Sequence, residues 1–283
     1  MMIAENIQGL LAGWLSSAAE NFVPEGKALE PELAGMRIFD EPLIGVCGAD
    51  DSYLLSLTDN DEANLHIMPP SEWLPGAKSV ISVYFPLSAR VRESNRCKGP
   101  VSLEWLHGRI EGQDCVEAAT RYLLGVIEDT PTGGSGDGAM AKAVAPSLDE
   151  RFRMMQLDGE PPTRRFSVNW SERHAAYAAG LGTFAMPGGI ITRVGAAGRL
   201  SSVITTIDIP PTPREYEGIY DYCIRCGACA LRCPAKAIGA NMSKNAELCS
   251  AQLNIPKEKY PPYYGCGKCQ VAVPCESAVP CSS

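Results

Sequence analysis

Most of the cysteines in this chain crowd into residues 223–281, and their spacing is that of an iron–sulfur binding segment. Residues 223–234 read CIRCGACALRCP, the pattern C-x₂-C-x₂-C-x₃-C-P. In this pattern short turns bring three thiolates to three corners of one [4Fe–4S] cluster, and the cysteine before the proline binds a second cluster. A zinc site commonly uses four ligands arranged as two pairs. The run therefore predicts iron–sulfur clusters rather than zinc.

The later cysteines complete two predicted sets of four ligands. Because the last cysteine of the run crosses to the other cluster, the first cluster takes Cys223, Cys226, Cys229 and Cys275. The second cluster takes Cys233, Cys249, Cys266 and Cys269. Cys275 stands further beyond Cys269 than is usual and lacks a following proline, so Cys281 is the alternative ligand at that corner. Two clusters in one small module favour electron transfer over a purely structural role.

The remaining cysteines and the N-terminus bear on the compartment. Cys47, Cys97 and Cys115 are scattered, and we interpret them as small buried hydrophobic residues. Many cysteines in a reducing compartment indicate metal binding rather than disulfides. The first residues carry Glu5 and no basic segment, unlike a secretion signal. No apolar run approaches the roughly 20 residues that span a bilayer, so we expect a cytoplasmic protein without a membrane contact.

The length and charge of the chain limit its class. Its 283 residues suffice for one large domain and one small one. Hydrophobic residues make up 45% and charged residues 20%, as in ordinary globular proteins. The net charge of −8 argues against nucleic acid as a partner.

Hydrophobic periodicity predicts the elements that must position the cysteine segment. A helix is expected where apolar residues recur at helical spacing near the N-terminus, at Ile7, Leu10, Leu11, Trp14, Leu15 and Ala18. Further helices are expected over residues 104–128 and 171–180, the latter with Ser171 as N-cap. Strands are expected over residues 42–47, 79–84, 189–192 and 202–207. The proline-rich residues 210–213 mark a boundary, which predicts domains at 1–212 and 213–283.

Several segments together resemble epoxyqueuosine reductase and its relatives, the reductive dehalogenases. They are WSERHAAYAAGLGTFAMPGGIIT (residues 170–192), the cysteine run, LCSAQLNI and YYGCGKCQ, in the order and spacing of that family. EWLPGAKSVISVYFPLS and AVAPSLDERF resemble its N-terminal domain. The resemblance implies an α+β protein. It has a nitroreductase-like α/β sandwich domain followed by a small ferredoxin-like domain with two [4Fe–4S] clusters.

The resemblance also implies a cofactor and a reaction. In that family a base-off cobalamin lies between the two domains, electrons pass from the distal cluster through the proximal one to cobalt, and an epoxide or a carbon–halogen bond is reduced. Carried over, the proximal cluster is the one bound by Cys223, Cys226, Cys229 and Cys275. The cofactor-binding residues along the corrin are Gly182, Thr183, Phe184 and Ala185. A homodimer through the nitroreductase-like domain is a further expectation.

The proton donor of the family has no counterpart here. Its V-D-T-A-P-V-L-E-R segment carries an aspartate, and this chain has Ala143 at that position, or Phe166 in an alternative alignment. The family's G-K-N after the helix is replaced by residues 185–188, AMPG, and the dehalogenases' tyrosine donor has no match. Because a general acid must lie within hydrogen-bond reach of the reacting atom, the remaining catalytic candidates are His174, Tyr177, Glu172 and Asp149.

Three functional hypotheses follow. The first is a reductase that takes electrons from an external low-potential donor, passes them through two clusters to cobalamin, and reduces a small molecule. The second is an electron-transfer protein without substrate chemistry, which serves a partner enzyme or reactivates a corrinoid protein; the missing aspartate favours it. The third gives the N-terminal domain a flavin or another small cofactor instead of the corrin.

Overall fold

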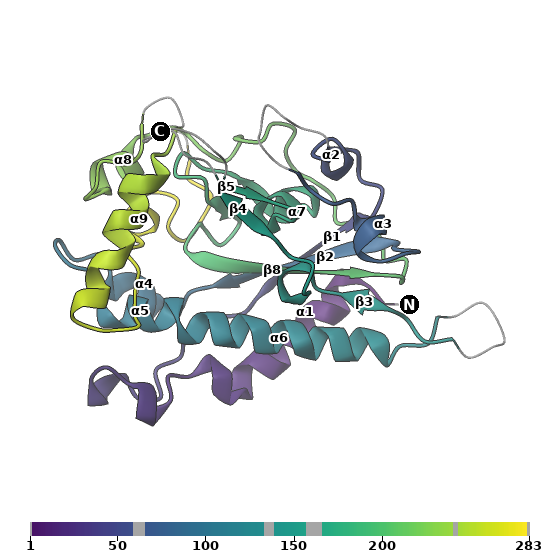
Figure 1. Cartoon of the computed structure of the whole chain (residues 1–283), viewed down its shortest axis with the longest axis horizontal. Helices are drawn as coiled ribbons and strands as arrows, with labels where there is room; N and C mark the ends of the chain where they lie inside the picture. Colours follow the sequence, from purple (N-terminus) through teal and green to yellow (C-terminus); the bar gives the residue numbers. More distant parts are fainter. Residues whose placement is uncertain (1, 59–65, 133–138, 157–165, 240–242, 282–283) are drawn as a thin grey trace.

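A four-stranded antiparallel sheet forms the centre of the protein (Figure 1). The computed structural model describes residues 2–58, 66–132, 139–156, 166–239 and 243–281. The strand order is β1 (Leu43–Gly48), β2 (Ser79–Pro86), β8 (Gly198–Thr205) and β3 (Ala143–Val144). β2 pairs with β8 along its whole length, and every residue of β2 is buried. A strand covered on both faces reads as a continuous apolar run, which explains the β-branched stretch seen in the sequence.

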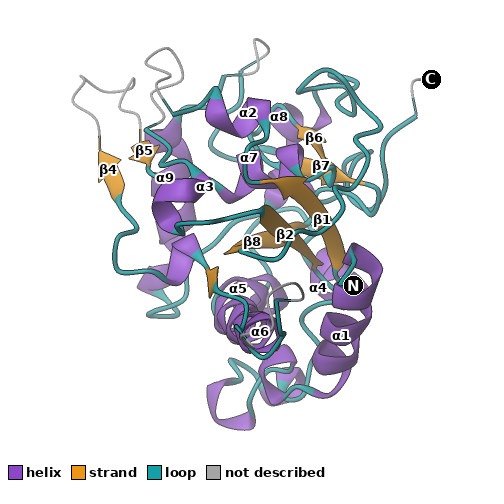
Figure 2. Cartoon of the chain, turned by 90° about the vertical axis from the view of Figure 1, so that its right-hand side faces the viewer, coloured by secondary structure: helices purple, strands orange, loops and turns teal. Residues whose placement is uncertain are grey.

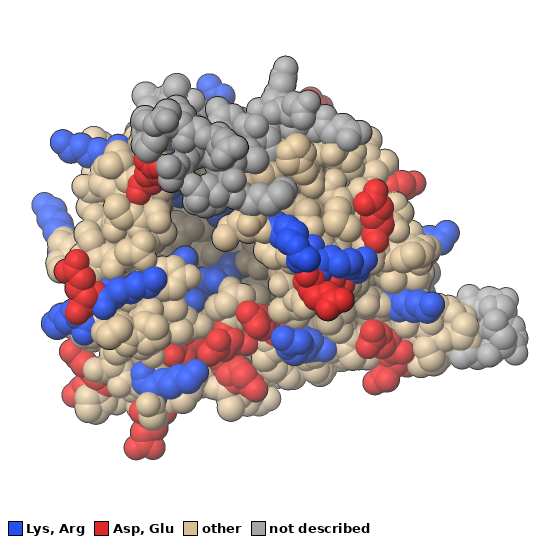
Figure 3. Space-filling view, in the orientation of Figure 1, with Lys and Arg blue, Asp and Glu red and all other residues tan. Residues whose placement is uncertain are grey.

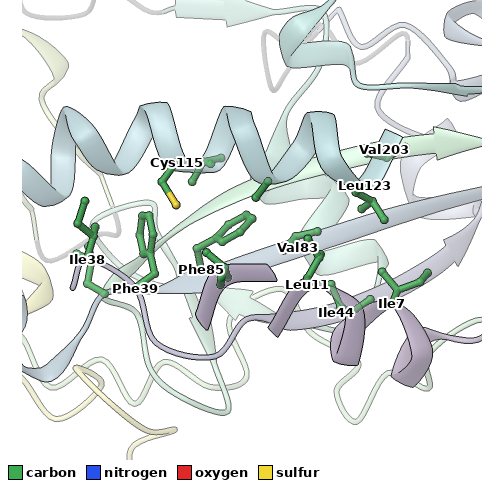
Figure 4. Close-up of a cluster of buried hydrophobic side chains, with 14 of the residues drawn as sticks. Ile7, Leu11, Ile38, Phe39, Ile44, Val83, Phe85, Cys115, Leu123 and Val203 are labelled. Atoms are coloured by element: carbon green, nitrogen blue, oxygen red, sulfur yellow. The ribbon is translucent and has the colours of Figure 1, made fainter. Parts of the chain in front are cut away.

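Two long helices, α1 (Ala4–Ser17) and α6 (Glu111–Glu128), cover one face of the sheet. Figure 4 shows side chains of both helices directed toward those of the strands, with Leu11 of α1 beside Val83 of β2 and Leu123 of α6 beside Val203 of β8. The N-terminal helix predicted from the sequence is confirmed, although Leu10 is 42% exposed. This layer is the main apolar core.

The predicted helix over residues 104–128 is two helices. α5 (Leu103–Arg109) ends just before Ile110, and α6 begins just after this residue. The two helices have different neighbours, since α6 lies on the sheet while Trp105 of α5 is in contact with Gly267 of the cysteine segment. A single straight helix does not contact both surfaces. The break at Ile110 lets α5 contact the cysteine segment while α6 packs on the sheet.

The opposite face of the sheet carries α7 (Glu172–Ala178), which contacts β1, β2 and β8 (Figure 2). Trp170, just before α7, packs edge-to-face on Trp73. The predicted helix is confirmed, but the Ser171 side chain does not cap it; the hydroxyl hydrogen-bonds with Nδ1 of His174 at 2.7 Å. Gly180, with φ of +79°, follows the helix and turns the chain.

The other elements are short. Two-stranded sheets are formed by β4 (Met154–Gln156) with β5 (Phe166–Val168), and by β6 (Gly182–Phe184) with β7 (Ile190–Thr192). The remaining helices are α2 (Ser52–Leu55), α3 (Pro70–Trp73), α4 (Ala89–Ser94), α8 (Ala228–Arg232) and α9 (Ala246–Asn254). Single 3₁₀ turns lie at Ala19–Asn21, Glu25–Lys27, Pro31–Leu33, Pro146–Leu148, Ile255–Glu258 and Lys268–Gln270. None of the helices in the described part of the chain is long and apolar enough to cross a membrane.

Polar contacts hold the C-terminal region against the rest of the protein. The Arg96 guanidinium donates to both carboxylate oxygens of Glu276, at 2.8 to 3.1 Å. The buried Lys268 ammonium donates to the backbone oxygens of Asn95 and Cys97. These bonds join segments far apart in the sequence, so the two regions form one packed unit. The boundary between residues 212 and 213 stays a prediction.

Candidate iron–sulfur and cofactor site

The first group of cysteines surrounds a small cavity near the C-terminus. The cavity is lined by the four thiols predicted for the first cluster, Cys223, Cys226, Cys229 and Cys275, together with the segment from Ala185 to Pro187. Gly227, with φ of +74°, turns the loop immediately before α8. Burial, together with a smaller effect of the nearby thiols of Cys229 and Cys223, raises the pKa of the Cys275 thiol to about 11. A raised pKa means that it costs free energy to form the thiolate. Binding to iron offsets this cost, because the thiolate is the form that ligates metals.

The second group lines a separate and larger cavity. All four cysteines predicted for the second cluster are in its wall: Cys233, Cys249, Cys266 and Cys269. Cys249 comes from α9, and the turn of Cys266 to Cys269 is pressed on Trp105 through Gly267, where any Cβ atom would overlap the indole ring. Burial raises the pKa of the Cys269 thiol to about 12. The thiols of Cys266, Cys249 and Cys233 contribute to this rise in pKa, and the Lys244 ammonium opposes it.

The two groups fit clusters better than single ions. Across the described ranges, no three His, Cys, Asp or Glu side chains converge on the position of one metal ion. A cubane carries four irons at separate corners, so its thiolates stand further apart than the ligands of one ion. The donor set is all thiol in each group, which suits [4Fe–4S] clusters. That each group binds a cluster stays a prediction.

The four remaining cysteines lie outside both groups. Cys281, the alternative ligand, is exposed and lines neither cavity that holds the predicted ligands. Cys47 and Cys115 are buried, as predicted, and burial raises the pKa of the Cys115 thiol to about 12. The prediction for Cys97 is wrong, because this residue is exposed. It follows α4 at the surface, where its thiol receives a hydrogen bond from the Lys268 ammonium at 3.3 Å.

The larger cavity has a volume of about 520 Å³ and extends from the second cysteine group to the central sheet. That volume is within the range of small-molecule sites, roughly 300–1,000 Å³. Its walls come from the ends of β2 and β8, the last turn of α5, the start of α7, and α9. Figure 3 shows a hollow on this face of the molecule, with blue Lys and Arg atoms inside it. The aromatic rings of Tyr84 and Trp105 are among its lining groups.

Positive charge dominates the cavity. Arg109, Arg173, Arg199 and Lys244 line it, and among its described lining residues Glu172 is the one acid. Burial, together with a smaller effect of the neighbouring Arg109 charge, lowers the pKa of Arg199 to about 10. The Arg109 Nε is buried without a hydrogen-bond partner among the described residues. The chain as a whole is acidic, so this concentration of cations is local.

Glu172 is the one predicted proton donor that lines the cavity. Neither of its carboxylate oxygens has a well-formed hydrogen bond within the described part of the chain. Burial raises the pKa of Glu172 to about 7, against the opposing influence of the Ser202 and Ser147 hydroxyls nearby. A buried carboxyl that titrates near neutral pH is suited to hold and release a proton.

The other three catalytic candidates lie elsewhere. Burial, with a smaller effect from Arg173, lowers the pKa of His174 to about 4, and its ring packs on Phe184 at a centroid distance of 4.9 Å. The Tyr177 hydroxyl donates to the backbone oxygen of Glu217. Asp149 forms an ion pair with Arg151 at 2.7 Å, and the hydrogen bonds from Arg151 hold its pKa below the usual range. These residues have structural partners and do not line the large cavity.

The predicted corrin-binding segment does not line the large cavity either. Gly182 and Thr183 are buried in β6, where the Thr183 hydroxyl accepts a bond from the Tyr222 backbone. Phe184 packs on His174, and Ala185 contacts the cavity of the first cysteine group. The large cavity adjoins the second cysteine group, whereas the resemblance assigned the proximal position to the first. The reason is the fold of the last segment, which turns residues 266–270 toward α5 and β8.

The arginines of the cavity were not found from the sequence. Arg109 ends a helix and Arg199 lies near the start of a strand, with 89 residues between them, and no motif marks either residue. The available signal was only that Arg199 is the one charged residue of β8, the strand that pairs with the fully buried β2.

Comparisons with known proteins agree with this architecture. Residues 216–239 match the 4Fe–4S binding domain family. No curated protein sequence matches the chain. An epoxyqueuosine reductase crystallised with an epoxyqueuosine-modified tRNA stem loop superposes with a TM-score of 0.52 at 17% identity. That match covers 96% of this chain and 66% of the other.

Two further similar structures have lower scores. The epoxyqueuosine reductase of Streptococcus thermophilus has a TM-score of 0.46 at 18% identity, over 82% of this chain and 62% of that one. A catabolic reductive dehalogenase has a TM-score of 0.45 at 14% identity, over 98% of this chain and 37% of that one. The chain thus spans less than two thirds of the length of these proteins.

The class of protein follows from these findings. This is an α+β protein with the fold of the epoxyqueuosine reductases and a 4Fe–4S binding segment of ferredoxin type. The resemblance drawn from the sequence is confirmed at the level of the fold, and the cysteine run lies within the matched 4Fe–4S binding domain.

Proposed function

We propose that this protein is an iron–sulfur oxidoreductase that passes electrons from an external low-potential donor, through two [4Fe–4S] clusters, to an acceptor held in the large cavity. One observation carries the proposal: all four thiols of the second cysteine group line that cavity. No protein layer separates the predicted second cluster from a bound acceptor. Such direct access favours electron transfer and has no use in a purely structural site.

The two cysteine groups differ in access to solvent, which supports an order in which the two clusters carry electrons. Cys226 of the first group is exposed, whereas no member of the second group is. An external donor therefore meets the first cluster, and the second cluster delivers to the cavity. This order exchanges the distal and proximal positions that the resemblance implied.

The cofactor in the cavity is proposed to be a corrinoid, and the residues present suit one. The aromatic side chains of Tyr84 and Trp105 offer flat apolar walls, and the arginines offer donors to amide and phosphate oxygens. A bound corrinoid supplies low-potential reduction chemistry. Glu172 is the proposed proton donor, since it lines the cavity and burial of its carboxyl raises its pKa to about 7. The surrounding protein keeps bulk water from this carboxyl.

The test is anaerobic purification from cells supplied with cobalamin, followed by metal analysis. We expect about eight irons and one cobalt per chain, from two cubanes and one corrin. A Glu172→Gln variant should keep both metals and lose turnover with a reducible substrate. About four irons per chain, or fewer, would contradict the two-cluster proposal.

A second candidate function is electron transfer to a partner protein without substrate chemistry. The observation in its favour is Ala143, which occupies the aspartate position of the resemblance and lies in β3, paired with Thr205 at the edge of the sheet. About eight irons without cobalt would support this function, and the acceptor is then a partner enzyme or a corrinoid protein. Extraction and mass analysis of the same sample would reveal a flavin if one takes the place of the corrin.

A further inference from the structure

Arg109 and Arg199 form a pair of like charges inside the large cavity. Both side chains line it, and the Arg109 charge is near enough to depress the pKa of Arg199. Two guanidinium groups in a poorly solvated site repel one another, and each loses hydration that a carboxylate partner normally replaces. Across the described ranges neither residue forms an ion pair. The Glu117 charge acts on Arg199 without forming an ion pair with it, so positive charge remains in excess in the cavity, whose lining holds four cationic side chains and one acid.

Other arginines of this protein show how such charge is usually balanced. Arg96 pairs with Glu276, Arg151 with Asp149, and Arg214 with Asp51. All three of these pairs lie outside the large cavity. The contrast separates arginines that hold the fold together from those that face the cavity.

Neutral groups hold the two cavity arginines in place. Arg199 donates to the side-chain oxygen of Gln113, and the Arg109 guanidinium lies 4.3 Å from the centre of the Tyr264 ring. Neither contact neutralises charge. Arg109 also keeps its buried Nε without a partner within the described residues. Oriented guanidinium groups with free donors bind carboxylate and phosphate in a bidentate manner.

We infer that the large cavity is an oxyanion-binding site, in which Arg109 and Arg199 take the carboxylate or phosphate group of a small ligand. Arg173 faces the same cavity and has no hydrogen bond or ion pair in the described part of the chain, so it adds to the positive field. The cavity continues to Glu172 and to the second cysteine group. An organic acid or organic phosphate anchored on the arginines therefore reaches a proton donor and the predicted electron source.

This inference deepens the proposed function and rests on it for the ligand's role as electron acceptor, but the binding step needs neither cobalt nor electrons. The oxyanion has two possible sources, a free substrate and the phosphodiester of a bound cobalamin. Both present the same chemistry to the arginines, and they are separable by experiment.

The experiment measures binding of inorganic phosphate and pyrophosphate to the cluster-containing, corrinoid-free protein by calorimetry. We expect saturable binding that weakens at least about tenfold in Arg109→Gln and in Arg199→Gln, as for loss of one partner of a buried charge pair. The control is Arg90→Gln, an exposed arginine of α4, which should leave binding unchanged. Wild-type affinity in both cavity variants, or no saturable binding to the wild type, would overturn the inference.

Two further measurements check that the variants are folded and identify the source of the oxyanion. Iron content and the melting temperature without ligand test whether the variants are folded. Cobalamin is then compared with cobinamide, which lacks the phosphodiester. A wild-type preference for cobalamin that disappears in Arg109→Gln assigns the oxyanion to the cofactor, and equal affinities assign it to a free ligand. Phosphate binding without cobalt retention contradicts the corrinoid and leaves this inference intact.

Discussion

The sheet region before residue 212 and the cysteine region after it are stabilised in different ways. In the first, the side chains of α1, α6 and the strands form one large apolar core, which includes Phe39, Phe85 and Leu123. In the second, regular structure is short, and α9 has no buried residue at all. Burial of apolar surface suffices for the first region. We expect the second to depend on metal ligation and on polar contacts with its neighbour.

This difference explains where the chemistry is placed. A region with little apolar core can wrap its loops closely around inorganic clusters, because metal binding supplies folding free energy. The rigid sheet region provides a fixed wall opposite the second cysteine group. The cavity lies at the contact between the sheet region and the cysteine region, which we expect the clusters to order.

Cluster ligands should have the largest effect. Cys269→Ser removes one predicted ligand of the second cluster, so iron should fall from about eight to about four per chain. Limited proteolysis should then cut the C-terminal region and spare the sheet region. Cys281→Ser, at an exposed cysteine outside both groups, should keep full iron content; a loss of iron there would instead make Cys281 a ligand in place of Cys275.

A core substitution should act on the sheet region alone. Phe85 is completely buried on β2, and Phe85→Ala should lower the free energy of unfolding by about 3–5 kcal/mol through lost burial and a cavity. Leu248, which is 47% exposed on α9, should tolerate alanine with little change. Urea unfolding followed by far-ultraviolet circular dichroism measures both. Equal losses at the two positions would show that α9 has an apolar core of its own.

Glu172 should make stability depend on pH. Burial raises its pKa from 4.5 to about 7, so between these values the unfolded state releases its proton first and the folded state binds more protons. Stability then falls as pH rises through this window, by about 3 kcal/mol in total. Glu172→Gln removes this contribution, and its melting temperature should exceed that of the wild type at pH 8 but not at pH 4. Parallel melting curves at both pH values would exclude a buried Glu172 with a raised pKa.

A buried hydrogen bond between the two regions should have a smaller effect. The Tyr263 hydroxyl donates to Glu111 Oε1 at 2.8 Å, and His107 contacts the other oxygen of this carboxylate at the same distance. Tyr263→Phe leaves the buried carboxylate without one donor, which should cost about 2 kcal/mol of stability. Tyr122→Phe provides the control, since the Tyr122 ring stacks on Trp14 and its hydroxyl has no hydrogen bond among the described residues. Denaturant midpoints that shift equally in both variants would argue against this contact.

The helices and strands predicted most accurately from the sequence are those that depend on local residue spacing. The helix near Ile7 and the strands near Val80 and Ser202 were found within a few residues of their bounds, because hydrophobic spacing is a property of neighbouring residues. The break at Ile110 was missed, since it depends on two surfaces met by α5 and α6 rather than on helix propensity. The exposure of Cys97 was missed for a similar reason, because its partner Lys268 is 171 residues away.

The candidate site divides in the same way. The spacing of residues 223–234 sufficed to predict the cysteine groups, since it is set by the turns that wrap a cluster, and Glu172 was among the four candidate proton donors. Folding in three dimensions was needed to show which candidate lines the cavity, which cysteine group adjoins it, and that Arg109 and Arg199 meet there. Cluster turns are fixed by a few consecutive residues, whereas the cavity is lined by residues of α5, α7, β8 and α9, which are far apart along the chain.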